Sequence, residues 1–417
     1  MLNPTIQVIP LSDYPLDKLE QEWNSLFNRS AGCFFLSWNW IGSWLSILPT
    51  FDDVYVVRAV NCSHFNTNMN STVVNKPPLD AGAFGDHVLD DDALEGYALD
   101  DLLGFGIFCE TKVRRHGFVK SKQWHLHRTG NEKLDQIWIE YNDLLLVKNP
   151  LINKQVEKAI WQYVNSNNKY SPDEILVNLA ANKALTSLIT SLDKKVITQK
   201  FIGYRKSTSD FDPQTLFTFK SKSTIKQITK TKRLLNNLGS YEIEHATDPT
   251  TVLSNLRRTQ KWHIKKWEQT NTPSGFKNRA FIKFHERLLT YNDESSEYNV
   301  LAVTLKLNKE IVGVNYCFYD SGSIYFYLAC LKPFDDNRLK VGQLLHFYTM
   351  TIAKDENRAY YDFLAGDQSY KSKLSDEKVQ FECITIQKKK FVFKLESCLS
   401  WIKNTLKNSI WKSYEKS

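Results

Sequence analysis

Ile324-Tyr-Phe-Tyr-Leu-Ala-Cys-Leu331 and Tyr360-Tyr-Asp-Phe-Leu-Ala-Gly366 are two short apolar runs that decide the fold of this chain. Runs of this length, rich in aromatic and aliphatic residues, are typical of buried strands. The residues between them, Val341–Lys354, predict a helix, and Val300–Leu307 with Ile311–Phe318 predicts a hairpin before them. The sequence therefore predicts the order meander, strand, helix, strand, which is an α/β arrangement.

The first half of the chain repeats this order. The segment 137–146 predicts a strand, Lys154–Val164 a helix and Glu174–Ala180 a further strand. Before them, 16–27 and the Trp-rich 34–48 have helical spacing, and Trp38, Trp40 and Trp44 are expected in the core. We therefore expect two tandem α/β units, 1–203 and 204–417, each a mixed, mostly antiparallel sheet flanked by helices.

The composition excludes several classes of protein. The chain has 417 residues, of which 42% are hydrophobic and 24% charged, the balance of a soluble globular protein. No stretch approaches the roughly 18 apolar residues of a membrane span, and the N-terminus does not resemble a signal peptide, so we expect a cytoplasmic protein. Seven cysteines are scattered singly without metal-ligand spacing, so we expect neither a metal nor a disulfide framework.

The net charge of +8 is unevenly distributed. Residues 61–101 contain eight acidic residues and one lysine, and we expect them to form an insertion loop between two strands. Basic residues cluster at 220–233 and 388–416. This distribution predicts an anionic partner: a phosphorylated carrier, a nucleic acid or a membrane surface. The basic run 220–233 has no interleaved aromatic residue, which argues against specific nucleic-acid recognition and leaves a solvated helix face as the alternative.

Several motifs give the chain a family resemblance. In the second half they are 221–233, 256–267, 275–288 and Tyr361-Asp-Phe-Leu-Ala-Gly-Asp-Gln-Ser-Tyr-Lys371; in the first half they are 38–44, Leu126-His-Arg-Thr-Gly130 and Ile139-Glu-Tyr-Asn142. With them the chain resembles the duplicated GNAT-type acyltransferases of the CelD/BcsL group (acetyltransferase 6) from bacterial polysaccharide loci. That group is related in fold to the FemAB aminoacyltransferases.

The resemblance implies transfer of an acyl group from acyl-CoA to an amine or hydroxyl of a saccharide or peptidoglycan-like acceptor. In GNAT folds the pyrophosphate of the carrier binds at the N-terminus of the helix after the fourth strand. The corresponding residues here are Arg338, Lys340, Val341, Gly342 and Gln343. The chain departs from the usual Arg/Gln-x-x-Gly-x-Gly/Ala signature, because Leu339 and Leu344 occupy its first and last positions.

The most specific motif also supplies the candidate catalytic residues. Asp362 and Asp367 are candidates for the general base, and the aromatic neighbours of Asp362 are expected to raise its pKa by desolvation. Tyr370 is a candidate proton donor to a leaving thiolate, and Lys371 a candidate anchor for an anionic group of the acceptor. The alternatives are that Asp362 pairs with Arg358 or Lys371, and that Tyr370 and Lys371 lie on an ordinary surface loop.

Four further residues are candidates for acceptor binding or catalysis. Asn315 and Tyr327 lie on predicted strands, and Trp262 and His263 on a predicted helix, 252–268. An indole suits stacking on a sugar ring, and a histidine is an alternative base. For each of them ordinary packing is the competing interpretation.

The C-terminal segment has apolar residues at helical spacing, flanked by lysines, from Leu395 to Ile410. This pattern predicts a helix docked on the second unit, or peripheral contact with a membrane. Two rival functions stay open. One is FemAB-like aminoacyl transfer from a charged tRNA, which predicts an inserted helical hairpin in the second unit; the other is a non-catalytic component of a polysaccharide assembly system.

Overall fold

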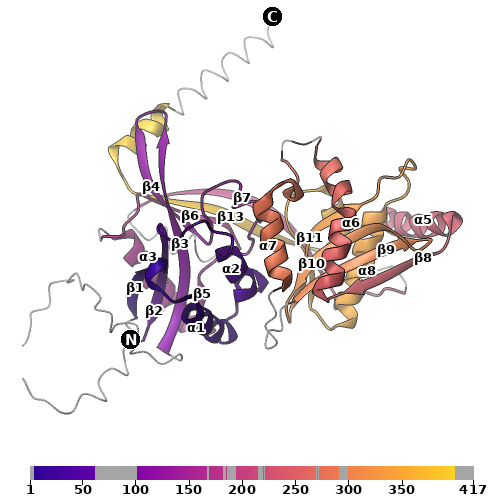
Figure 1. Cartoon of the computed structure of the whole chain (residues 1–417), viewed down its shortest axis with the longest axis horizontal. Helices are drawn as coiled ribbons and strands as arrows, with labels where there is room; N and C mark the ends of the chain where they lie inside the picture. The colour runs from indigo at the N-terminus through magenta and orange to yellow at the C-terminus, as the bar shows by residue number, and fades with distance from the viewer. Residues whose placement is uncertain are drawn as a thin grey trace, which may run out of the picture.

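Strands from both halves of the chain form one continuous sheet in the computed structural model (Figure 1). The structure describes residues 4–61 and 101–399, except 167–168, 182–184, 186–193, 215–218, 220, 269, 271 and 291–298. The strand order is β1-β2-β3-β4-β6-β13-β7-β12-β11-β10-β9-β8, and the short β5 pairs with β3. The mixed α/β fold expected from the sequence is confirmed. Most of the predicted acidic insertion lies outside the described residues.

The elements follow the predicted order in each half. The strands of the first half are β1 (Thr5–Pro10), β2 (Val54–Val60), β3 (Leu102–Arg115), β4 (Val119–Leu126), β5 (Leu145–Leu146), β6 (Glu174–Ala180) and β7 (Lys195–Ser207). Those of the second half are β8 (Tyr241–Ala246), β9 (Asn299–Leu307), β10 (Glu310–Tyr319), β11 (Ser323–Leu331), β12 (Tyr360–Ala365) and β13 (Glu377–Gln387). The helices are α1 (Leu16–Asn28), α2 (Trp38–Leu45), α3 (Pro150–Asn165), α5 (Lys222–Leu238), α6 (Pro249–Trp267), α7 (Arg279–Thr290), α8 (Val341–Asp355) and α9 (Ser369–Leu374). Short 3-10 turns lie at Leu11–Asp13, Phe34–Leu36 and Gly275–Lys277.

The last strand of each half completes the sheet of the other half. β7 leaves the first half and pairs antiparallel with β12, whereas β13 ends the second half and pairs antiparallel with β6. β7 and β13 also pair with each other over their common length. The predicted division at residues 203 and 204 therefore falls inside β7, and it does not separate two independent sheets.

The duplication is visible in the backbone as well as in the element order. β4 pairs in parallel with the start of β6, as β11 pairs with the start of β12. β6 and β12 then each bulge at a Leu-Ala pair, where Leu179 and Leu364 have φ of +51° and +61°. Because a leucine at positive φ is unfavourable by about 1 kcal/mol or more, surrounding contacts must hold both bulges.

One apolar core spans the two halves. It contains Trp23 and Trp40 from the first half together with Phe281 and Phe318 from the second half, all of them almost fully buried. The ring of Trp40 contacts those of Phe284 and Phe318 edge-on, at 4.8 and 5.5 Å. The expectation that the Trp-rich segment belongs to the core is confirmed. Separate cores lie beneath α3 and beneath α5 and α8.

The predicted strand at 137–146 is wrong except for β5. Asp135 accepts hydrogen bonds from the backbone of Thr129 and Gly130, which folds this segment into a loop. Trp138 and Tyr141 adopt positive φ, and a continuous strand does not accommodate that conformation. The loop extends into the second half, where the hydroxyl of Tyr327 donates to the carbonyl of Ile137 at 2.7 Å.

The described part of the predicted C-terminal helix docks on the first half, so the expectation that it packs on the second half is wrong for this part. Residues 391–399 are helical and lie against the β3–β4 hairpin (Figure 1). Arg115 of β3 donates two hydrogen bonds to Glu396, at 2.8 and 3.0 Å. The predicted stripe continues to Ile410, which lies outside the described residues. Among the described helices, none is long and apolar enough to cross a membrane.

Candidate active site

A cavity of about 510 Å³ lies where β11 and β12 separate. The two strands pair in parallel only from Ser323 to Tyr325 and from Tyr360 to Asp362. Beyond these residues β11 continues beside β10, while β12 continues beside β7. The cavity is therefore bounded by Phe326 to Leu331 of β11 on one side and by Phe363 to Ala365 of β12 on the other. The backbone of β11 along this edge faces the cavity instead of a neighbouring strand.

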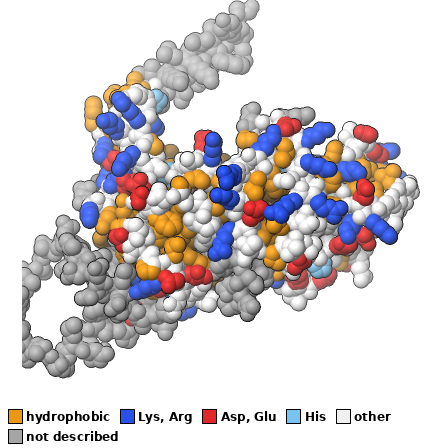
Figure 2. Space-filling view, viewed as in Figure 1, with side chains coloured by type: hydrophobic (Ala, Val, Ile, Leu, Met, Phe, Trp, Pro, Cys, Tyr) orange, Lys and Arg blue, Asp and Glu red, His pale blue; other side chains and the backbone are white. Residues whose placement is uncertain are grey.

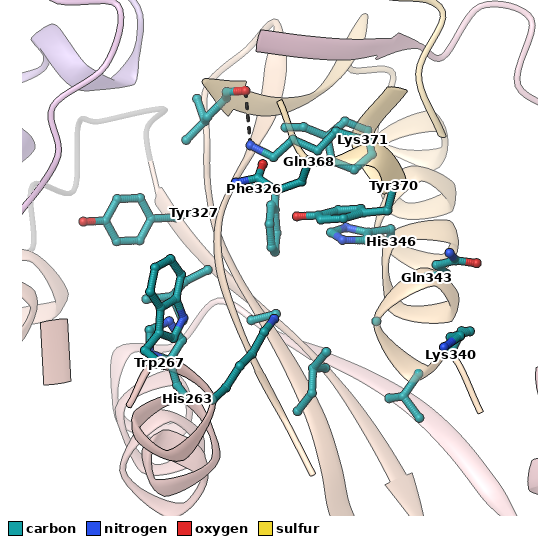
Figure 3. A pocket seen from close by; sticks show the side chains of 18 of the residues that line it. His263, Trp267, Phe326, Tyr327, Lys340, Gln343, His346, Gln368, Tyr370 and Lys371 are labelled. Atoms are coloured by element: carbon teal, nitrogen blue, oxygen red, sulfur yellow. Dashed lines mark hydrogen bonds between the residues drawn. The ribbon is translucent and has the colours of Figure 1, made fainter. Parts of the chain in front are cut away.

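The N-terminus of α8 opens into this cavity (Figure 3). Lys340 occupies the cap position, no side chain caps the helix, and its first turn contains no acidic residue. The first backbone N–H groups of a helix lack partners within the helix and carry a partial positive charge, so this end favours an anion. Four lysines line the cavity: Lys266, Lys332, Lys340 and Lys371.

Helix α5 fixes the loop that leads into α8. Gln227 donates to the carbonyl of Arg338 at 2.7 Å, and the backbone N–H of Lys340 donates to the hydroxyl of Thr231 at 3.2 Å. The predicted basic helix therefore packs beside the N-terminus of α8.

The inner end of the cavity is built around the peptide group of Ala365. Its N–H donates to Glu140 at 2.6 Å, and its carbonyl accepts from the ammonium of Lys371 at 2.7 Å. Glu140 comes from the loop of the first half, so both halves contribute to this end. Burial raises the pKa of Glu140 above its ordinary value, against the opposing effects of the Ala365 N–H and the Lys371 charge. Burial lowers the pKa of Lys371.

Tyr370 extends its hydroxyl into the cavity from the start of α9 (Figure 3). Its ring stacks on that of His346 at 5.3 Å, and burial raises its pKa to about 12. The phenol is therefore neutral at physiological pH and holds a proton that it can donate. Burial lowers the pKa of His346 to about 3, and its Nδ1 lies 2.7 Å from the hydroxyl of Tyr361.

Aromatic side chains line the opposite wall. His263 and Trp267 of α6 stack on each other at 5.5 Å, and Trp138 and Tyr327 complete this side of the cavity. Ser274 lies 2.8 Å from Nδ1 of His263, and burial lowers the pKa of this histidine to about 4. A histidine of that pKa is neutral but weakly basic at pH 7, which makes it a poorer base than Glu140.

The structure brings most of the predicted site residues into this one cavity and leaves five outside it. Those lining the cavity are His263, Tyr327, Lys340, Val341, Gly342, Gln343, Tyr370 and Lys371. Those outside its lining are Trp262, Asn315, Arg338, Asp362 and Asp367. The two positions that depart from the GNAT signature also differ: Leu339 lines the cavity, and Leu344 is buried in the core beneath α8.

The two aspartates lie outside the cavity, and each is bonded elsewhere. Asp362 is buried, accepts a hydrogen bond from Tyr141 of the first half and accepts another from the N–H of Leu364 at 2.7 Å. Burial raises its pKa to about 6, as the sequence predicts, although its partner is Tyr141 and neither Arg358 nor Lys371 bonds to it. Asp367 is exposed and accepts from the hydroxyl of Tyr204 at 2.5 Å.

The other three residues outside the cavity lining also have local partners. Arg338 is exposed and pairs with Asp336 through hydrogen bonds of 2.8 Å. Asn315 is buried beneath α8, where its amide lies 3.5 Å from His346. Trp262 is partly buried against the core that spans the halves, as the packing interpretation predicts.

Glu140 is the residue that the sequence did not identify. It belongs to the quoted motif Ile139-Glu-Tyr-Asn142, so the signal was present. The segment resembles a strand, and nothing in the sequence indicates that Glu140 lies beside Ala365, which follows it by 225 residues. No group of three or more metal-ligating side chains is found within the described residues.

Comparisons with known proteins bear on the second half of the chain and on the fold. Residues 222–372 match the family model of the acetyltransferase (GNAT) domain. No curated protein is significantly similar to the chain in sequence. Among solved structures, FemX shares 10% identity with a TM-score of 0.51, covering 87% of this chain and 95% of its own. A conserved protein of unknown function from Bacteroides thetaiotaomicron shares 13% identity with a TM-score of 0.50, covering 93% of this chain and all of its own.

These two likenesses show the fold, and the family match lies on the half that contains the cavity. The matched residues include α8, β12 and most of α9, which provide the helix terminus, Ala365, Tyr370 and Lys371. The second half of the chain therefore contains a GNAT acetyltransferase domain, which supports N-acyltransferase activity.

Proposed function

We propose that the protein transfers an acyl group from acyl-CoA to an amine or hydroxyl of a saccharide or cell-envelope precursor. The observation that carries the proposal is that one cavity has a helix N-terminus at one end and the Glu140–Lys371 pair at the other. A carrier with a pyrophosphate and a thioester needs these two environments at opposite ends of its site.

The carrier would be held at the start of α8. The uncapped N–H groups of Val341, Gly342 and Gln343 and the charge of Lys340 suit its pyrophosphate. Gly342 leaves this terminus open on one side, since a Cβ there would meet only the end of the Leu331 side chain, at 2.9 Å. The pairing of Arg338 with Asp336 argues against a direct role for Arg338 in holding the carrier.

The chemistry would take place beside Ala365. A nucleophilic amine attacks the thioester carbonyl, so that a C–N bond forms and the C–S bond breaks. We assign Glu140 as the base that takes the proton of the amine, because its raised pKa brings it close to the operating pH. Tyr370 returns a proton to the leaving thiolate, and Lys371 positions the Ala365 peptide that binds Glu140.

The acceptor would enter along the aromatic wall. Trp138, Trp267 and Tyr327 present ring faces or edges that suit a sugar ring, with the first half closing the groove through Trp138. We place the reaction in the cytoplasm, at the membrane face where envelope precursors are assembled.

The tRNA-dependent alternative predicts a helical hairpin inserted into the second half. The described helices of this half, α5 to α9, each pack on the sheet or on another helix that does, and none forms such an insertion. The non-catalytic alternative is disfavoured by Glu140 and Tyr370, which bring two groups suited to proton transfer to the same cavity.

Calorimetric titration of the full chain with CoA and acetyl-CoA tests the carrier site. We expect binding by the wild type, a loss of at least tenfold in affinity with Gly342→Asp, and a loss of about three- to tenfold with Lys340→Ala. Lys283→Ala, which removes an exposed lysine of α7 outside the cavity, should bind as the wild type does. Absence of binding by the wild type would refute acyl-CoA as the donor and direct the search to charged tRNA.

A further inference from the structure

The tip of the β3–β4 hairpin and the helix at 391–399 form one protruding surface, which we call the hairpin–helix surface. In Figure 1 the two elements project together from the body of the molecule. They are joined by Arg115, which donates to Glu174 at 2.9 Å and to Glu396 at 2.8 Å, and whose guanidinium lies 5.8 Å from the ring of Phe393. The hairpin and the helix are therefore held as a unit.

Large apolar side chains are exposed on this unit, in addition to those that pack against the hairpin. Phe393 turns inward and is 2% exposed, whereas Phe391 is 79%, Leu395 40% and Leu399 44% exposed. The spacing of four places these three on one side of the helix. Phe118 at the hairpin turn adds a fourth apolar side chain, which is 43% exposed.

The charges around these side chains are almost all positive. Residues 111–120 contain four Lys or Arg and no acidic residue, and residues 388–399 contain four Lys and one Glu. That one acid, Glu396, is already paired with Arg115. Figure 2 shows blue and orange side chains side by side on this projection.

We propose that the hairpin–helix surface binds the anionic face of a lipid bilayer. Aromatic and leucine side chains on a convex tip, surrounded by lysine and arginine, can enter the headgroup layer while the cations contact the phosphates. The core of an interface with another protein is depleted of charged residues, whereas here the apolar side chains are interleaved with cations. The proposal is independent of the acyl-CoA site, because no residue of the hairpin–helix surface lines that cavity.

Sedimentation of the full chain with vesicles tests the proposal. We expect binding to vesicles of phosphatidylglycerol and phosphatidylcholine, weaker binding as NaCl is raised, and little binding to phosphatidylcholine alone. Phe391→Ser and Lys394→Glu should each reduce the bound fraction, the latter by at least about fivefold in partition coefficient. Leu238→Ser, an exposed leucine (52%) at the end of α5, is the matched control and should have no effect.

Phe118→Ser decides whether the surface acts as a unit. Because Phe118 lies on the hairpin, its replacement should weaken vesicle binding only if hairpin and helix bind together. Unchanged binding by Phe118→Ser, or equal binding to neutral vesicles, would overturn the proposal. The competing explanation is that the surface binds a second copy of the chain, and light scattering tests it. A wild-type dimer that does not bind vesicles and that Phe391→Ser converts to monomers would support that explanation and overturn the proposal. CoA titration of the same variants should be unchanged, so failure here is distinct from failure of the carrier site.

Discussion

Replacing Tyr141 with phenylalanine tests whether Asp362 is a structural carboxylate that joins the two halves. Asp362 is buried, and its pKa is raised from 3.8 to about 6 by burial, against the opposing hydrogen bond from Tyr141. Below pH 3.8 the carboxyl group is protonated in both folded and unfolded chains. As the pH rises to about 6 the unfolded chain loses this proton first, so Asp362 lowers the free energy of unfolding by about 3 kcal/mol across that window.

The Tyr141→Phe variant should therefore lose more stability at high pH than at low pH. At pH 8 the tyrosine donates to a charged carboxylate, a hydrogen bond that contributes about 1.5–3 kcal/mol. At pH 5 the folded protein holds Asp362 mostly protonated, and the same bond is worth about 0.5–1.5 kcal/mol. The expected loss is thus about 1–2 kcal/mol greater at pH 8.

Urea unfolding of the wild type and the variant at both pH values, at constant ionic strength, measures this difference. Tyr327→Phe is the matched control, because its hydroxyl donates to the carbonyl of Ile137, which does not titrate. Its loss of stability should be the same at both pH values. If Tyr141→Phe also lost equal stability at pH 5 and pH 8, the carboxylate would not be the partner that stabilises this contact, and Asp362 would return as a candidate base.

Three further predictions follow from the same geometry. Glu140→Gln should reduce the rate of acyl transfer, measured as thiol release from acyl-CoA, by about 10²–10⁴-fold and leave the affinity for CoA unchanged. Glu132→Gln, on the same loop, is the control and should have no effect. Equal rates for Glu140→Gln and the wild type would refute Glu140 as the base. Gly203→Ala should destabilise the fold by about 1–3 kcal/mol, because the added Cβ would lie 2.5 Å from the ring of Phe381. Gly322→Ala is the control: its Cβ would lie 3.5 Å from the carboxylate of Asp320, and the variant should melt as the wild type does. Deleting residues 62–98 should leave cooperative melting intact, since the backbone at either side of the insertion is already joined by a 2.9 Å hydrogen bond; a non-cooperative melt would contradict this.

The sequence predicted the elements that depend on local pattern. The strands around Ile324 and Tyr361, the helix from Val341 and the buried Trp40 all follow from periodicity and composition, and the structure contains each of them. The helix terminus at Lys340 also followed from the order of the elements. Each of these features depends on a stretch of about 20 residues or fewer, which is the length over which hydrophobic periodicity can be recognised.

The features that the sequence did not predict depend on contacts between distant residues. One such feature is the exchange of β7 and β13, each of which pairs with a strand of the other half. Alternation of apolar residues predicts that a segment is a strand, but it does not indicate which strand will pair with it. The sequence predicts Asp362 as a candidate base because it belongs to the most specific motif, and its aromatic neighbours favour desolvation. The desolvation is present, but the bulge at Leu364 directs the side chain to Tyr141.

A difference between the duplicated halves supports placing the proposed carrier site in the second half. In that half, α8 begins without a side-chain cap, so its first N–H groups are open to the cavity. In the first half, the equivalent helix α3 begins with Pro150, and the side chain of Asn149 accepts from the next two N–H groups, at 3.1 and 3.3 Å. An anion there would have to displace a bonded cap. The loop before α3 is instead extended and gives Glu140 to the other half, so the two units contribute different parts of one site.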